Sequence, residues 1–191
     1  MSIDDVFDLR SQGLTAEAYE AARSLYAADK SPRAATAMYL SAADMRRQLM
    51  SAGDSANAHK IDEALRRLLT HTPKHLLLGI WGEEEAASYL RQSGYILLER
   101  DWHSKHRDID VIALHDGVTV FVEVKTRRNR IFTEPEDSVD YQKLRNLRLA
   151  INHYLQYSKT DGPWRFDVVT VVGELGSRSP DISHLQDFSL L

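Results

Sequence analysis

The sequence contains no cysteine, which excludes disulfide bonds and metal sites built from thiolates. It also lacks an apolar run long enough to cross a bilayer, so we expect no association with a membrane. The first five residues, 1–5, are acidic and lack the basic start and apolar stretch of a secretory signal. These absences together favour a cytoplasmic protein.

No strong positive charge is present either. The net charge of −4 argues against a polycation that coats nucleic acid without selectivity. Any contact with nucleic acid must therefore come from a local basic patch. The hydrophobic fraction of 43% and the charged fraction of 27% are typical of a globular protein.

The chain divides into two parts by its periodicity. Residues 1–74 predict helices only, with N-cap signals at Ser2, Thr15 and Ser31. Their closely spaced small and aromatic residues are loosely similar to tetratricopeptide repeats, and such helices serve as protein-interaction modules. Residues 75–191 alternate helices with strands, which predicts an α/β domain whose mixed central sheet is flanked by helices.

A hairpin is predicted at Asp116-Gly117, which joins strands at 108–115 and 118–127. A two-residue turn there places Asp110 opposite Glu123, and Asp108 opposite Lys125. Side chains alternate between the two faces of a strand, so these four charged groups share one face at the end far from the turn.

Two facing carboxylates repel each other unless a cation lies between them. Carboxylate oxygens suit Mg²⁺ or Mn²⁺, and an adjacent lysine can orient or deprotonate a water molecule and offset phosphate charge. The pattern of Asp110, Glu123 and Lys125 therefore indicates hydrolysis of a phosphodiester by metal-bound water. The alternative interpretation is a solvated hairpin end with an Asp108–Lys125 ion pair.

Asp110 followed by Glu123-Val124-Lys125 is similar to the D…ExK signature of the PD-(D/E)xK nuclease superfamily. More closely, the second part resembles the YraN family of endonuclease-like bacterial proteins. The resemblance rests on Gly79-Ile80-Trp81-Gly82-Glu83, Asp108-Ile109-Asp110, Val120–Arg127, Lys143 and Arg165–Val169.

The resemblance implies a restriction-endonuclease-like fold related to Holliday-junction resolvases. It implies that Asp110, Glu123 and the carbonyl of Val124 bind the metal. It also implies that Lys125 is the catalytic lysine and that Glu83 is a further acidic residue near the metal. One departure is Arg107-Asp108, where the family usually has glycine and glutamate.

A basic run follows the predicted catalytic strand and continues in the next helix. Phosphate binding needs such charges beside a metal, although charge runs are more often solvated surface. The candidates for nucleic-acid binding are Arg127, Arg128, Arg130 and Lys143.

These features predict a Mg²⁺-dependent endonuclease that acts on DNA, including branched or structured DNA. The alternative is a nucleic-acid-binding module that keeps the nuclease fold, cuts little or not at all, and is targeted by its helical N-terminal part. A protein partner for residues 1–74 is compatible with either hypothesis. The analogy with junction resolvases adds the expectation of a homodimer.

Overall fold

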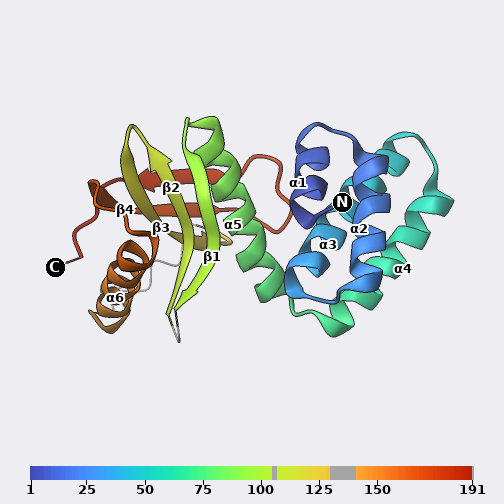
Figure 1. Ribbon diagram of the computed structural model, residues 1–191. Helices are drawn as coiled ribbons and strands as arrows, with labels where there is room; N and C mark the ends of the chain where they lie inside the picture. The colour runs from blue at the N-terminus through green and yellow to red at the C-terminus, as the bar shows by residue number, and fades with distance from the viewer. Residues whose placement is uncertain (105–106, 130–140, 191) are drawn as a thin grey trace. The chain divides into compact units, whose positions relative to one another are not determined.

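The computed structural model describes residues 1–104, 107–129 and 141–190 of the 191-residue chain. The chain forms two compact units, Met1–Trp81 and Gly82–Leu191, so the division falls within a helix (Figure 1). The sequence places the domain boundary near residue 74, and that assignment stays a prediction. Within the described residues, no helix is both long and apolar enough to cross a membrane.

The first unit consists of helices, as predicted. They are α1 (Ile3–Ser11), α2 (Thr15–Ala28), α3 (Pro32–Ser51), α4 (Ser55–His71) and the first part of α5 (Lys74–Gln92). Small side chains of α2 and α3 are fully buried, which allows the helix backbones to pack closely. These side chains are Ala18, Ala22, Ala34, Ala35 and Ala37.

The expected N-caps are confirmed at two of three helices. Ser2 accepts a hydrogen bond from the N–H of Asp5 in a capping box, and Ser31 accepts one from the N–H of Ala34. The expectation for Thr15 is wrong, because α2 begins at Thr15 itself and Leu14 occupies the cap position. The Thr15 hydroxyl donates instead to the carbonyl of Gly13, which removes it from the cap.

The second unit contains a five-stranded mixed sheet in the order β1-β2-β3-β4-β5. The strands are β1 (Ile96–Ser104), β2 (Arg107–His115), β3 (Val118–Arg127), β4 (Trp164–Val172) and β5 (Asp181–Leu185). All neighbours are antiparallel except β3 and β4, which are parallel and separated in sequence by α6 (Tyr141–Ser158). The α/β class and the mixed sheet are therefore confirmed. Helix α6 covers one face and the second part of α5 covers the other (Figure 1).

Strand β1 is longer than its sequence suggests. The apolar run predicts a strand that ends at Glu99, whereas β1 continues to Ser104. It is an edge strand, so polar side chains along it remain in contact with solvent. An irregularity in pairing between Leu97 and Glu99 and a positive φ of 50° at Asp101 accommodate this polar stretch.

The predicted hairpin forms with the expected register. Asp116 and Gly117 have φ values of 49° and 77°, the conformation that a two-residue type I′ turn requires. His115 pairs with Val118, and the pairing continues regularly to Val111 and Val122. The turn therefore fixes the register of the two strands as far as Val111 and Val122.

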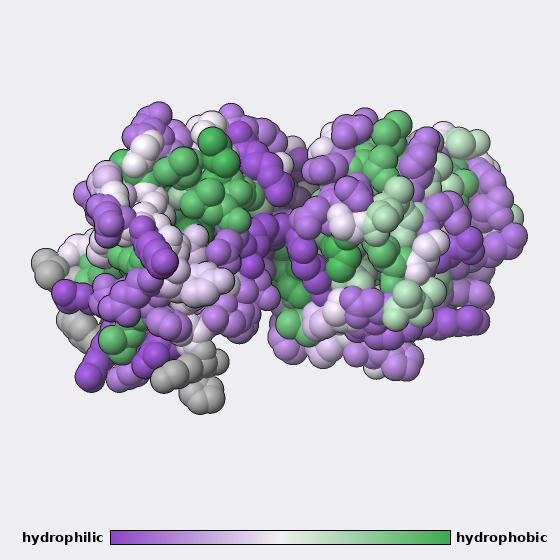
Figure 2. Space-filling model, viewed as in Figure 1, coloured by the Kyte–Doolittle hydropathy of each residue, from purple (hydrophilic) through white to green (hydrophobic). Residues whose placement is uncertain are grey.

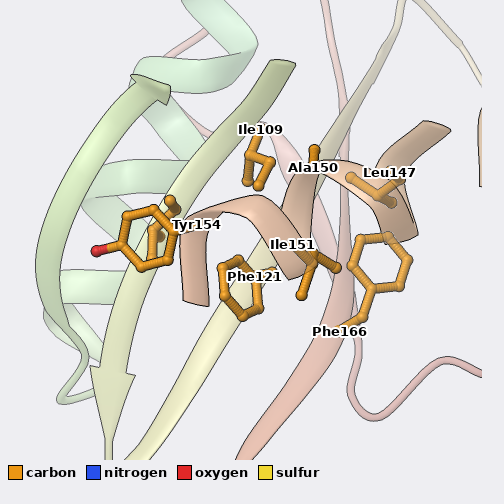
Figure 3. Packing of buried hydrophobic residues seen from close by; sticks show 8 residues of the cluster. Ile109, Phe121, Leu147, Ala150, Ile151, Tyr154 and Phe166 are labelled. Carbon is orange, nitrogen blue, oxygen red and sulfur yellow. The ribbon is translucent and has the colours of Figure 1, made fainter. Parts of the chain in front are cut away.

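The core between the sheet and α6 holds that end of the hairpin in place (Figure 3). Ile112 and Phe121 of the hairpin are fully buried against the α6 residues Ile151 and Tyr154. The Tyr154 ring meets Phe121 edge to face at 5.6 Å, a favourable aromatic geometry. The position of Tyr154 among helical apolar residues predicts a core residue and not a platform for bases, and its exposed fraction of 4% confirms the core position.

The polar residues around Trp102 predict a loop, but Trp102 is half-buried and packs against this core. It lies in β1 opposite Ile109, and its ring meets Tyr154 edge to face at 5.4 Å. Ile109 joins the same cluster as Ile112, so β2 departs from strict alternation near Asp110. The sequence missed this packing because Trp102 stands among polar residues whose strand was not predicted.

The other face of the sheet carries a close approach of α5. A Cβ atom added to Gly82 would lie 1.9 Å from Oγ1 and 2.8 Å from Cβ of Thr126 in β3. The second distance involves a Cβ atom, so a side-chain rotation alone cannot relieve the clash. Glycine at position 82 therefore sets how closely the helix, and with it Glu83, approaches the end of β3.

We expect Gly82→Ala to lower the free energy of unfolding by about 1–3 kcal/mol, because the helix must move away from β3. Gly79→Ala is the matched control, since no atom lies within 4 Å of its added Cβ. That change should stabilise α5 by up to about 1 kcal/mol through helix propensity. Urea unfolding of both variants measures the difference, and equal stabilities would contradict the close contact.

The last strand is attached to the sheet through a buried carboxylate. Asp167 of β4 accepts hydrogen bonds from Arg165 at 3.0 Å, His184 at 2.9 Å and the N–H of Asp187 at 2.9 Å. Burial alone would raise the pKa of Asp167, but these donors hold the pKa below its usual range. The three contacts tie β5 and the residues after it to β4.

Candidate active site

The backbone ladder between β2 and β3 ends just before the charged residues. The last pair is Val111 with Val122. The prediction that Asp110 and Glu123 form the next pair of the ladder is therefore wrong. The carboxylate of Asp110 instead accepts a hydrogen bond of 2.6 Å from the N–H of Val124. A side chain thus replaces a backbone acceptor, and the end of the hairpin opens into a cavity.

This cavity has a volume of about 440 Å³ and lies entirely within the second unit. It is lined by residues of α5, β2, β3 and α6: Glu83, Arg107, Asp108, Asp110, Glu123, Val124, Gln142, Lys143, Asn146 and Leu147. The structure therefore brings together five of the residues predicted from the sequence, namely Glu83, Asp110, Glu123, Val124 and Lys143. The lining is dominated by charged and polar side chains.

Asp110 has a strongly altered acidity. Burial and the nearby charge of Glu123 raise the pKa of Asp110 from 3.8 to about 7, despite the opposing effect of the Val124 hydrogen bond. Glu83 and Asp108 add smaller contributions in the same direction. The repulsion between the two carboxylates makes it costly for both to be ionised.

A cation of the protein lies beside this pair. Lys143, from the first turn of α6, donates a hydrogen bond to Oε1 of Glu123. Burial would lower the pKa of Lys143, but the hydrogen bond and negative charge of Glu123 outweigh it and raise the pKa. Lys143 thus partly neutralises the acidic cavity in the absence of a metal.

The acidic residues at the start of the family motif point in different directions. Glu83 lines the cavity, whereas Glu84 is 7% exposed and forms an ion pair of 2.8 Å with Arg100 of β1. Successive helical residues are separated by about 100°, so neighbouring carboxylates take separate partners. The choice of Glu83 came only from the family resemblance, and its place in the cavity agrees with that choice.

Lys125 has a different position from the one its motif suggests. Its side chain is exposed and does not line the cavity. Arg127 is half-buried and Arg128 is exposed, and neither lines the cavity, while Arg130 lies outside the described residues. The proposed roles of these four residues stay predictions.

The donors in the cavity fit a small divalent cation. Mg²⁺ commonly uses one or two carboxylates and completes its octahedron with water and phosphate oxygens. Asp110 and Glu123 supply two carboxylates. The N–H of Val124 points toward Asp110, so its carbonyl lies on the same side of β3. Among the described residues, no three acidic or histidine side chains converge on one point, so protein ligands alone do not fill the coordination sphere.

Three polar residues of the cavity were not predicted as site residues. Gln142 and Asn146 belong to the start of α6, and Arg107 begins β2. The sequence offers a signal only for Arg107, which departs from the family pattern beside Asp108. The two amide side chains carry no motif, and only the packing of α6 brings them to the cavity.

These features define a mixed α/β protein with an acidic cavity at the open end of a β-hairpin. The uncharacterised protein family UPF0102 matches residues 82–171, and this match begins at the first residue of the second unit. The chain belongs to this family, and the resemblance to the YraN proteins is thereby confirmed.

Three relatives illustrate the extent of the similarity. A UPF0102 protein of Bacteroides thetaiotaomicron is 39% identical over 104 residues, which are 54% of this chain and 86% of the relative. A UPF0102 protein of Syntrophomonas wolfei is 43% identical over 109 residues, 56% of this chain and 93% of the relative. One from Nocardia farcinica is 42% identical over 113 residues, 57% of this chain and 86% of the relative.

Proposed function

We propose that the second unit is a metal-dependent endonuclease of the PD-(D/E)xK type with a restriction-endonuclease-like fold. Its substrate would be DNA, including branched or structured DNA. The observation that carries the proposal is that Asp110 and Glu123 line one cavity, where burial and the charge of Glu123 raise the pKa of Asp110 to about 7. A site of this kind is expensive for stability and is characteristic of function.

The residues of the chain take distinct roles in this proposal. Asp110, Glu123 and the carbonyl of Val124 would hold Mg²⁺ or Mn²⁺, which would supply a more acidic bound water and stabilise charge on the phosphate. Lys125 would approach the reacting water or phosphate from the end of β3. Glu83 would position water near the metal, and Lys143 would offset the charge of the phosphate.

Nucleic acid would reach the cavity along the basic residues at the end of β3 and directly after it. Arg127 and Arg128, with Arg130 outside the described residues, provide positive charge on the chain segment that leaves the site. Contacts of this kind release counterions, so binding should weaken steeply as salt increases.

The first unit would dock a protein partner through its helices, for which the likeness to tetratricopeptide repeats is the basis. A homodimer is proposed by analogy with junction resolvases.

One observation favours the alternative of a binding module without cleavage. The exposed Lys125 does not line the cavity, and the lysine that does is bonded to a proposed metal ligand. In this arrangement no lysine of the described cavity lining is placed to orient the attacking water, which cleavage would need. Cleavage then depends on whether a divalent cation displaces Lys143 from Glu123.

The test is an assay of the wild-type protein on labelled duplex DNA and a labelled four-way junction, with Mg²⁺, Mn²⁺ or EDTA. If the protein is a metal-dependent endonuclease, cleavage products should form with either metal and none should form in EDTA. Binding of the probes without products in any condition would favour the binding module instead.

Lys143→Met should increase affinity for Mg²⁺ about three- to fivefold, because it removes a cation that competes for Glu123. Lys125→Met is the matched control and should leave the affinity unchanged, because Lys125 lies outside the cavity lining. Calorimetric titration of Mg²⁺ into both variants measures the difference. Equal affinities for the two variants would contradict the role of Lys143 as a competing cation.

A further inference from the structure

Arg107 has an unusual environment for an arginine. It is half-buried at the start of β2 and lines the cavity with the carboxylates of Glu83, Asp108, Asp110 and Glu123. Its buried Nε has no hydrogen-bond partner, and no described residue forms a hydrogen bond or an ion pair with its guanidinium group. The other cationic side chain in the lining, Lys143, is paired with Glu123.

An unsatisfied buried donor costs stability of about 1–3 kcal/mol. Two other arginines, Arg47 and Arg100, also have a buried Nε without a hydrogen-bond partner. Unlike Arg107, they form a hydrogen bond to a carboxylate through a terminal nitrogen, Arg47 to Asp44 and Arg100 to Glu84. Arg107 lies near several carboxylates and still makes no such bond. A direct hydrogen bond or ion pair with a described residue therefore does not account for its position.

The missing partner should be an anion with oxygen atoms arranged for a planar donor. A guanidinium group matches phosphate oxygens with two parallel hydrogen bonds, which an ammonium group cannot do. Gln142 and Asn146 of α6 line the same cavity, and their side-chain amides are further hydrogen-bond donors. The cavity thus combines carboxylates suited to a cation with donors suited to a phosphate.

We propose that Arg107 binds a phosphate group of the nucleic-acid strand inside this cavity, next to Asp110 and Glu123. The inference rests on the proposed function for the class of ligand and adds the residue that receives the phosphate. Arg107 positions the strand, and its unpaired state in the structure reflects a binding group kept ready for substrate.

The experiment measures binding of a fluorescein-labelled duplex by fluorescence anisotropy, in EDTA and in Ca²⁺, over a range of salt concentrations. Gels run beside it verify that the duplex stays intact. The variants are Arg107→Met, Arg107→Lys and the matched control Arg91→Met, whose exposed side chain near the end of α5 lies outside the cavity. Thermal unfolding of each variant is recorded in parallel.

Arg107→Met should bind the duplex about 5- to 20-fold more weakly, and its logarithmic salt slope should be lower by about one. Its unfolding temperature should stay close to that of the wild type, because no described residue pairs with the guanidinium group that the substitution removes. Arg107→Lys should keep the salt slope and recover part of the affinity. Arg91→Met should match the wild type in binding.

Two results would overturn the phosphate site. One is unchanged affinity and salt slope in Arg107→Met. The other is a marked loss of stability in that variant, which would give Arg107 a structural role. Binding that depends on Arg107 without cleavage of any probe would remove the nuclease function and keep the phosphate site. Cleavage of the probes with binding that does not depend on Arg107 would keep the nuclease function and remove the phosphate site.

Discussion

Replacing Glu123 with glutamine should lower the rate of metal-dependent cleavage by at least about 10³-fold. The substitution keeps the shape of the side chain and removes the negative charge through which it would hold the cation. An amide oxygen can still accept the hydrogen bond from Lys143, so the start of α6 stays in place. The measurement is the initial rate on labelled DNA with saturating Mg²⁺.

The same variant should fold normally. Glu123 is one of the causes of the raised pKa of Asp110, and removing its charge relieves the repulsion between the two carboxylates. Glu174→Gln serves as the control for a loss of one negative charge, because Glu174 is exposed and does not line the cavity. Full activity in Glu123→Gln would show that the metal site has been assigned to the wrong residues.

Replacing Asp110 with asparagine should stabilise the metal-free protein at pH 8 by about 2–4 kcal/mol. Burial and the charge of Glu123 raise the pKa of Asp110 to about 7 in the folded state, against 3.8 for the ordinary carboxyl group. The folded protein therefore loses stability as pH rises from about 4 to about 7, where the unfolded chain is already ionised. Asparagine can still accept the hydrogen bond from the N–H of Val124 and carries no charge at any pH.

The stability difference between Asp110→Asn and the wild type should depend on pH. Below pH 4 the carboxyl group is protonated in both states, so wild type and variant should have nearly equal stability. The advantage of the variant should grow through the interval up to pH 7 and stay constant above it. Urea unfolding at a series of pH values measures this difference. A variant that is less stable than the wild type at pH 8 would contradict the close placement of the two carboxylates.

Local patterns in the sequence were sufficient for the hairpin. The Asp116-Gly117 turn has one favoured geometry, and the period of two along a strand then fixes which side chains share a face. Those two facts predict that Asp110 and Glu123 lie close together, and both residues line one cavity. The sequence could not predict that the ladder ends before them, because the acceptor for Val124 is a side chain.

Long-range packing explains the features that were missed. Lys143 reaches Glu123 only because α6 crosses the sheet, and no local pattern determines that crossing. Trp102 packs against the core because a polar sequence forms an edge strand, and strand propensity is a weak guide to such strands. Arg107 stands out in the sequence only as a departure from a family motif, and its unpaired guanidinium group is visible only in the structure.

The central claim is that Asp110 and Glu123 form a binding site for a divalent cation. Calorimetric titration of Mg²⁺ into the wild-type protein and into Asp110→Asn at pH 8 tests it most directly. We expect saturable binding of Mg²⁺ to the wild type and no binding to the variant over the same concentrations. Equal binding to both proteins, or no binding to the wild type, would contradict the metal site and with it the proposed nuclease.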